Sequence, residues 1–143
     1  MIVAAALGSC TSRSDPDFAE MQGRGQTAMG VDQYLSTHQF EALADGGRIE
    51  LQRNEVDPRD VATIRSHLKE VMSKMRRGDF STSEFVHGQE PAGARVMSAR
   101  RDFIQYTYAD LPRGGEIRMK TIDPEALRAI HAFIAFQQNE HHR

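Results

Sequence analysis

The side chains best suited to binding chemistry are three histidines and a methionine within residues 67–131. His87 and Met97 share a segment without strong periodicity, whereas His67 and His131 fall on the apolar sides of two expected helices. Imidazole nitrogen and thioether sulfur, with no thiolate and no dense set of carboxylates, suit copper, especially Cu(I), better than calcium or magnesium. We therefore expect His67, His87, Met97 and His131 to contact a ligand. The expected metal ligands among them are His87, Met97 and His131.

These residues also have a purely structural interpretation. A histidine on an apolar helix face is commonly a core residue hydrogen-bonded to backbone or carboxylate, and methionine is an ordinary core filler. Hydroxyl side chains at residues 81–83 lie near His87, but no strand-to-helix nucleophile elbow accompanies them. An enzyme therefore ranks third, behind a binding module and an interaction domain. His141 and His142, close to the carboxyl end, are expected to be solvated.

Two copies of one pattern indicate the elements that position these residues. Residues 46–68 and residues 114–134 each read as a Gly-Gly turn, an alternating strand, an Asp-Pro helix start and an amphipathic helix. Alternation predicts a half-buried strand, and Asp before Pro predicts an N-cap followed by the first helical residue. A further strand is expected over residues 103–108 and a short helix over residues 31–44.

Charges on the two repeated strands suggest how these strands pair. Arg48 corresponds to Glu116, and Glu50 corresponds to Arg118. A parallel pair in equal register would set opposite charges beside each other, whereas an antiparallel pair with the isoleucines opposed would set like charges together. We therefore expect an α+β fold: a split β-α-β-β-α sandwich resembling a ferredoxin-like fold without its last strand, with two helices on one face of a small mixed sheet.

The amino-terminal residues resemble an export signal. Leu7-Gly8-Ser9-Cys10 follows an apolar run and resembles the bacterial lipobox, whose cysteine is lipidated. We expect residues 1–10 to be a truncated signal segment, residues 11–30 a flexible tether, and residues 31–143 a single domain. The protein would then belong to the cell envelope, as a periplasmic or outer-membrane lipoprotein that touches the membrane only through Cys10.

Composition bears on the partners. A net charge of −2 with mixed signs provides no electrostatic basis for binding nucleic acid. A single cysteine excludes an internal disulfide framework. An open sheet edge would allow a homodimer. The favoured function is an exported or lipid-anchored small binding protein, with copper as its most specific ligand hypothesis. The alternative is an interaction or structural domain of the envelope that has no small ligand.

The stretch from Asp45 to His141 also resembles a family of small bacterial exported proteins of uncharacterised activity. The matching pieces are Gly78-Asp79-Phe80, Val86-His87-Gly88, Pro91-x-Gly93, Met97, Leu111-Pro112-Arg113-Gly114-Gly115 and Ala129-Ile130-His131-x-Phe133. The resemblance implies a shared fold and an exported location, with no established activity. Such sequences are sometimes labelled aspartate carbamoyltransferase. That label does not fit, because this chain lacks the Ser-Thr-Arg-Thr-Arg phosphate loop that the activity requires.

Overall fold

Residues 16–32 and 35–141 are described by a computed structural model of the chain. The predicted lipidation site at Cys10, and the whole segment 1–10, lie outside these residues. The elements, in chain order, are α1 (Pro16–Met29), β1 (Ser36–Leu43), β2 (Gly46–Arg53), α2 (Pro58–Arg76), α3 (Ser81–His87), α4 (Ala94–Ala99), the 3₁₀ helix η2 (Arg101–Phe103), β3 (Gln105–Leu111), β4 (Gly114–Lys120) and α5 (Pro124–His141).

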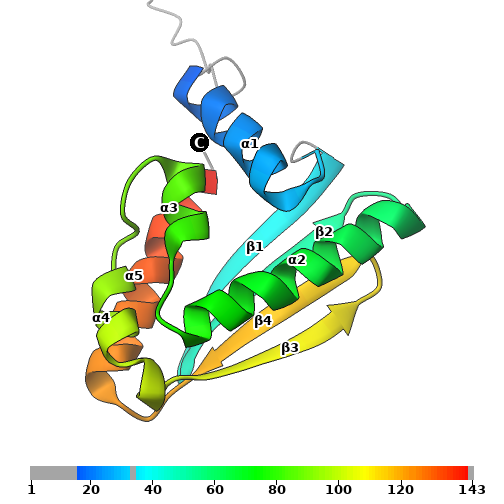
Figure 1. The fold of residues 1–143 in the computed structure, drawn as a ribbon. Coiled ribbons are helices and arrows are strands. Elements are labelled where there is room, and N and C mark those ends of the chain that lie inside the picture. The colour runs from blue at the N-terminus through cyan, green and yellow to red at the C-terminus, as the bar shows by residue number, and fades with distance from the viewer. Residues whose placement is uncertain (1–15, 33–34, 142–143) are drawn as a thin grey trace, which may run out of the picture.

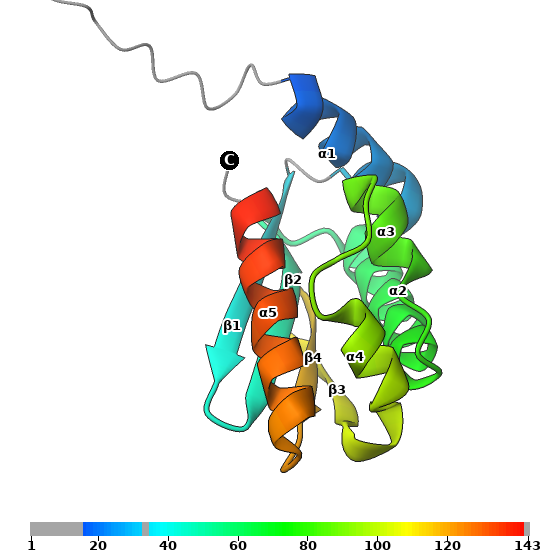
Figure 2. The same cartoon turned by 90° about the vertical axis from the view of Figure 1, so that its left-hand side faces the viewer.

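The four strands form one open sheet in the order β1-β2-β4-β3, and every neighbouring pair is antiparallel. Helices α2 and α5 cover the same face of this sheet, while α3 and α4 lie next to α5 (Figures 1 and 2). The core lies between sheet and helices, and its largest fully buried side chains are Leu51, Ile64, Met97, Ile117, Met119, Ile130 and Ile134. The predicted α+β sandwich is therefore confirmed.

The predicted parallel pairing of the two repeated strands is wrong, and the sheet is not mixed. In the antiparallel β2–β4 pair, Arg48 lies opposite Arg118 and Glu50 lies opposite Glu116. The like charges are tolerated because each arginine finds an acid elsewhere. Arg48 Nη2 lies 2.5 Å from Glu41 Oε2 on β1, and Arg48 Nη1 lies 3.7 Å from Glu116 Oε2 diagonally across the pair.

Arg118 is neutralised from the β1–β2 turn, where its guanidinium binds the carboxylate of Asp45. The predicted parallel pairing compared the charges of the two repeated strands alone. A central strand also has a second neighbouring strand and a turn at its end, and both can supply charged partners. Diagonal and third-strand partners therefore outweigh the unfavourable direct pairs.

The glycine pairs mark close approaches between β2 and β4. A Cβ atom on Gly46 would lie 1.9 Å from the carbonyl oxygen of Met119, and one on Gly114 would lie 1.9 Å from that of Leu51. These distances leave no room for a side chain. The Gly-Gly pairs, predicted as turn residues, thus allow the two central strands to approach at both ends of their pairing.

The helix predicted over residues 31–44 is wrong, because most of this stretch forms strand β1. His38 and Phe40 alternate with the exposed Thr37, Gln39 and Glu41, which is the pattern of a half-buried strand. The apolar residues of this stretch also fit helical spacing, so periodicity alone was ambiguous. Pairing along the whole of β2 decides the conformation, since it satisfies the backbone of β1.

Residues 16–29, predicted as part of a flexible tether, instead form helix α1. Met21 and Gly25 of α1 are buried, and the helix packs against α3 and the end of α2 (Figure 1). Arg24 Nε also donates to the carbonyl oxygen of Val86 at 2.9 Å. Contacts with the rest of the fold therefore stabilise a helix that its own polar, glycine-containing sequence does not predict. Within the described residues, no helix has the length and apolar character needed to cross a bilayer.

Candidate functional site

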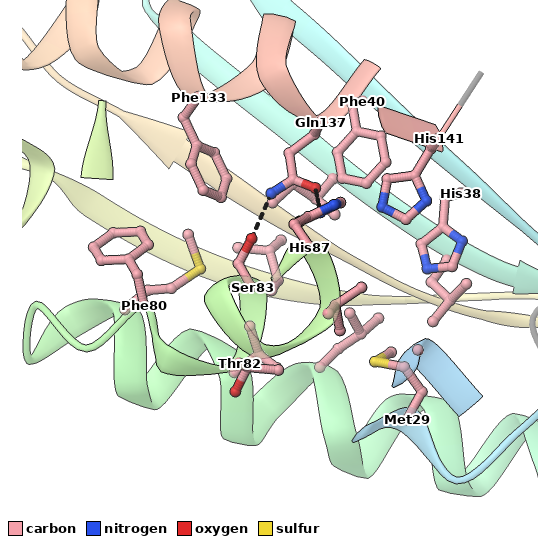
Figure 3. A pocket seen from close by; sticks show the side chains of 18 of the residues that line it. Met29, His38, Phe40, Phe80, Thr82, Ser83, His87, Phe133, Gln137 and His141 are labelled. Atoms are coloured by element: carbon pink, nitrogen blue, oxygen red, sulfur yellow. Dashed lines mark hydrogen bonds between the residues drawn. The ribbon is translucent and has the colours of Figure 1, made fainter. Parts of the chain in front are cut away.

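A cavity of about 100 Å³ lies between the sheet and helices α2, α3 and α5. Helix α1 contributes Gly25 and Met29 to its wall, and Met29 is labelled in Figure 3. Most of the wall is apolar and comes from the strands and α2. Three aromatic side chains complete it, namely Phe40, Phe80 and Phe133, the last two packing edge to face with their ring centres 5.6 Å apart. The polar side chains that reach this cavity come mainly from α3 and α5.

A short chain of hydrogen bonds runs along one side of the cavity. His87 Nε2 lies 2.8 Å from Gln137 Oε1, and Gln137 Nε2 donates to Ser83 Oγ at 2.7 Å (Figure 3). Because an amide oxygen can only accept, His87 Nε2 carries the proton in this arrangement. Gln137 is 4% exposed, so both halves of its amide depend on these protein partners.

His87 is the centre of this group. Its side chain is 1% exposed, its Nδ1 has no hydrogen-bond partner among the described residues, and Glu140 Oε2 lies 3.8 Å from that nitrogen. The rings of Phe136 and His141 meet it edge to face, each with centres 5.1 Å away. Burial lowers the pKa of His87, while the Gln137 hydrogen bond and the Glu140 charge oppose that shift. The imidazole is therefore neutral near pH 7.

A second imidazole borders the cavity beyond His141 (Figure 3). His38, on β1, stacks on His141 with ring centres 4.8 Å apart, and His141 in turn stacks on Phe40 at 5.0 Å. Burial lowers the pKa of His38 to about 4, with a smaller contribution from His87. His38 is thus also uncharged at neutral pH. His141, predicted to be solvated, is only partly exposed and lines the cavity.

Of the four ligand residues predicted from sequence, His87 lines the cavity and the other three lie elsewhere. Met97 is fully buried in the core. His131 Nε2 lies 2.7 Å from the carbonyl oxygen of Leu43, at the end of β1. His67 lines a separate groove between α1 and α2. The structure therefore does not bring His87, Met97 and His131 into one metal site.

The cavity imidazoles do not form a prepared metal site either. Among residues 16–32 and 35–141, no three His, Cys, Asp or Glu side chains are arranged to hold an ion. His38 and His141 stack face to face, and imidazole lone pairs lie in the ring plane, so the two rings do not direct their nitrogens at one point.

Sequence reasoning missed His38, Gln137 and His141 as site residues, and it noted Ser83 only as a neighbour of His87. His38 could have been found, because a similar alternation precedes both Gly-Gly pairs: residues 36–43 before the first and residues 104–111 before the second. Ser83 lies on α3, within a stretch expected to lack regular structure. Nothing in the sequence distinguishes Gln137 from the polar residues that follow it. Its role depends on the packing of α5 against α3.

Comparisons of the chain with protein-family models, curated proteins and solved structures gave no match. The geometry of the cavity is therefore the basis for a functional proposal.

Proposed function

We propose that this protein is a small-molecule-binding module of the cell envelope, anchored by a lipid at Cys10, and that the cavity between the sheet and α2, α3 and α5 is its binding site. The observation that carries the proposal is the combination of an apolar wall with a buried polar chain from Ser83 through Gln137 to His87. Small-molecule sites commonly have this composition: mostly apolar surface with a few fixed polar groups that orient the ligand.

The size of the cavity supports the same proposal. Protein interiors are normally close-packed, with few voids larger than a water molecule. The cavity here measures about 100 Å³ and is partly open to solvent. A ligand that fills it would remove its apolar wall from water. A cavity retained next to buried polar groups is therefore better explained as a binding site than as imperfect packing.

The binding site is tested by filling the cavity. Val71 lines it from α2, and Val71→Phe would place an aromatic ring in the open space. The matched control is Val56→Phe, since Val56 is 77% exposed and lies outside the cavity wall. Amide NMR spectra would be recorded with a set of small neutral fragments. We expect at least one fragment to shift cavity resonances in the original protein and in Val56→Phe, but not in Val71→Phe.

Two results would contradict a binding role for the cavity. One is that no fragment shifts the resonances of residues in its wall. The other is that the same shifts persist in Val71→Phe, because the fragments would then bind elsewhere. Circular dichroism of both variants would verify that they remain folded.

The envelope location rests on the lipobox-like Leu7-Gly8-Ser9-Cys10 and on the family resemblance of residues 45–141. It is tested by expressing the full chain behind a complete export signal in a Gram-negative host supplied with an alkyne-labelled fatty acid. We expect the protein to carry the fatty-acid label and to be found in the membrane fraction. Cys10→Ser should lose the label and release the protein to the soluble fraction. Equal labelling of the original protein and of Cys10→Ser would contradict a lipid anchor at Cys10.

A copper-binding form of this function has less support, because the three predicted metal ligands are apart. A titration with Cu(I) still provides a direct test. We expect Met97→Ala and His131→Ala to leave any Cu(I) affinity unchanged, since Met97 lies in the core and His131 faces a backbone carbonyl. A tenfold loss of affinity in both variants would restore the original copper hypothesis.

A homodimer formed through a sheet edge is a second proposal, since β1 and β3 are the outer strands of an open sheet. Sedimentation equilibrium over a wide concentration range tests it directly. A protein that stays monomeric at the highest concentration would contradict a dimer.

A further inference from the structure

We infer that the cavity takes a neutral ligand built on a single six-membered ring, with one oxygen atom that accepts a hydrogen bond from the Ser83 hydroxyl. This inference rests on the proposed binding function and specifies the class of ligand. It is carried by three properties of the cavity: its size, the absence of a cationic side chain from its described wall, and the hydrogen-bonding state of Ser83.

The size limits the ligand to one ring. An apolar cavity of about 150 Å³ in another protein is known to take up benzene. The cavity here measures about 100 Å³, which is closer to the space needed for one such ring than for a fused ring system or a long acyl chain. The aromatic rings of Phe40, Phe80 and Phe133 provide a wall suited to a compact ring.

The charge of the wall favours a neutral ligand. Its described residues include no lysine or arginine, so a ligand anion would have no strong cationic partner. Asp79 is the one carboxylate of the wall, and its Oδ1 already accepts a hydrogen bond from the backbone N–H of Ser81 at 2.9 Å. Low pKa values keep His38 and His87 uncharged near pH 7. A ligand anion would therefore lose its hydration without gaining a fixed counter-charge, and a ligand cation could meet only Asp79, whose Oδ1 already binds the backbone of Ser81.

The polar chain determines which group the ligand presents. His87 and Gln137 are hydrogen-bonded to each other, and Gln137 Nε2 donates to Ser83 Oγ, so that oxygen already accepts one hydrogen bond. A serine hydroxyl also has one proton to donate. Within the described part of the chain, that proton has no acceptor, and Ser83 lines the cavity (Figure 3). A ketone, ether or ester oxygen on the ligand would satisfy it, whereas a pure hydrocarbon would leave it unpaired.

The inference is tested with four compounds that share one ring: cyclohexanone, cyclohexane, cyclohexanecarboxylate and cyclohexylammonium. Their affinities for the full chain at pH 7 would be measured from amide shifts of the cavity residues. We expect cyclohexanone to bind about fivefold more tightly than cyclohexane, as expected for one hydrogen bond. Both charged compounds should bind at least tenfold more weakly than cyclohexanone.

Substitution of the serine isolates the hydrogen bond. Ser83→Ala should weaken cyclohexanone binding about fivefold and leave cyclohexane binding unchanged. The matched control is Ser73→Ala, an exposed serine on α2 outside the cavity wall, which should change neither affinity. Should Ser83→Ala fail to fold, the four affinities of the original protein still test the inference.

The outcomes separate this inference from the proposed function. If the carboxylate or the ammonium compound binds as well as the ketone, or if Ser83→Ala weakens ketone and hydrocarbon equally, the ligand class is wrong while a binding cavity remains. If none of the four compounds shifts cavity resonances, the ring-shaped ligand is overturned. The wider fragment experiment with Val71→Phe then determines whether the cavity binds anything.

Discussion

Replacing Gln137 by leucine is the most direct test of the buried polar chain. Gln137 lies on α5, and its amide joins His87 Nε2 at 2.8 Å to Ser83 Oγ at 2.7 Å. Leucine has a similar size but no polar atom. Gln137→Leu therefore removes both hydrogen bonds while retaining the volume of the side chain, which separates the polar contribution from packing.

The expected loss follows from burial. Each hydrogen bond contributes about 1 kcal/mol net, and leaving the buried Nε2–H of His87 without an acceptor adds a desolvation cost of about 1–3 kcal/mol. Greater burial of apolar surface by leucine offsets about 1 kcal/mol of this. The free energy of unfolding should therefore fall by about 2–4 kcal/mol. At about 3 °C for each kcal/mol in a domain of this size, that corresponds to a decrease in Tm of roughly 6–12 °C.

Thermal unfolding followed by circular dichroism measures this change. The control is Asn139→Leu, two residues further along the same helix, where the side chain is exposed. We expect this control to change Tm by less than about 2 °C, in line with the small effect of most surface substitutions. An unchanged Tm for Gln137→Leu would refute the reasoning, because it would mean that His87 and Ser83 do not depend on the amide.

Three further predictions concern pH, the strand contact and the core. Burial lowers the pKa of His38 from 6.5 to about 4, so between these pH values the unfolded chain binds more protons than the folded one. The free energy of unfolding should therefore fall as the pH drops from 6.5 to 4, by up to about 1.4 kcal/mol per pH unit. Denaturant titrations should show a weaker pH dependence for His38→Phe. Gly114→Ala places a Cβ 1.9 Å from the Leu51 carbonyl oxygen and should cost about 3 kcal/mol in urea unfolding. Met97→Ala should cost about 2–5 kcal/mol by the same measurement without affecting ligand affinity, since Met97 is a core residue outside the cavity wall. A pH profile unaltered by His38→Phe, or losses below about 1 kcal/mol in the other two variants, would contradict these contacts.

The two long helices were predictable because their start signals are local. Asp57 caps α2 by accepting hydrogen bonds from the backbone N–H groups of Arg59 and Asp60, with proline at the first helical position. Asp123 accepts from the backbone N–H of Ala126 at the start of α5. Such contacts join residues two or three positions apart, so they can be recognised from a short stretch of sequence. Strands β2 and β4 were predictable for a similar reason, since alternation records which face is buried.

The partner of each strand could not be read in the same way. Opposite charges on the repeated strands favoured parallel pairing, yet Arg48 and Arg118 lie opposite each other and are neutralised by Glu41 and Asp45. Both acids belong to the β1–β2 hairpin, which was not predicted. Long-range pairing depends on the sum of contacts with all neighbours, and a pairwise comparison of two strands contains only part of that sum.

By itself, the sequence determined the α+β class, the starts of α2 and α5, and the burial of one face of β2 and β4. Only the tertiary structure decided which residues share the cavity. His38, Ser83, His87 and Gln137 come from β1, α3 and α5, and they meet because α3 and α5 pack over the inner face of the sheet. Helical and strand periodicities are local properties, whereas a site between elements depends on contacts between residues far apart in the chain, which no spacing along the sequence records.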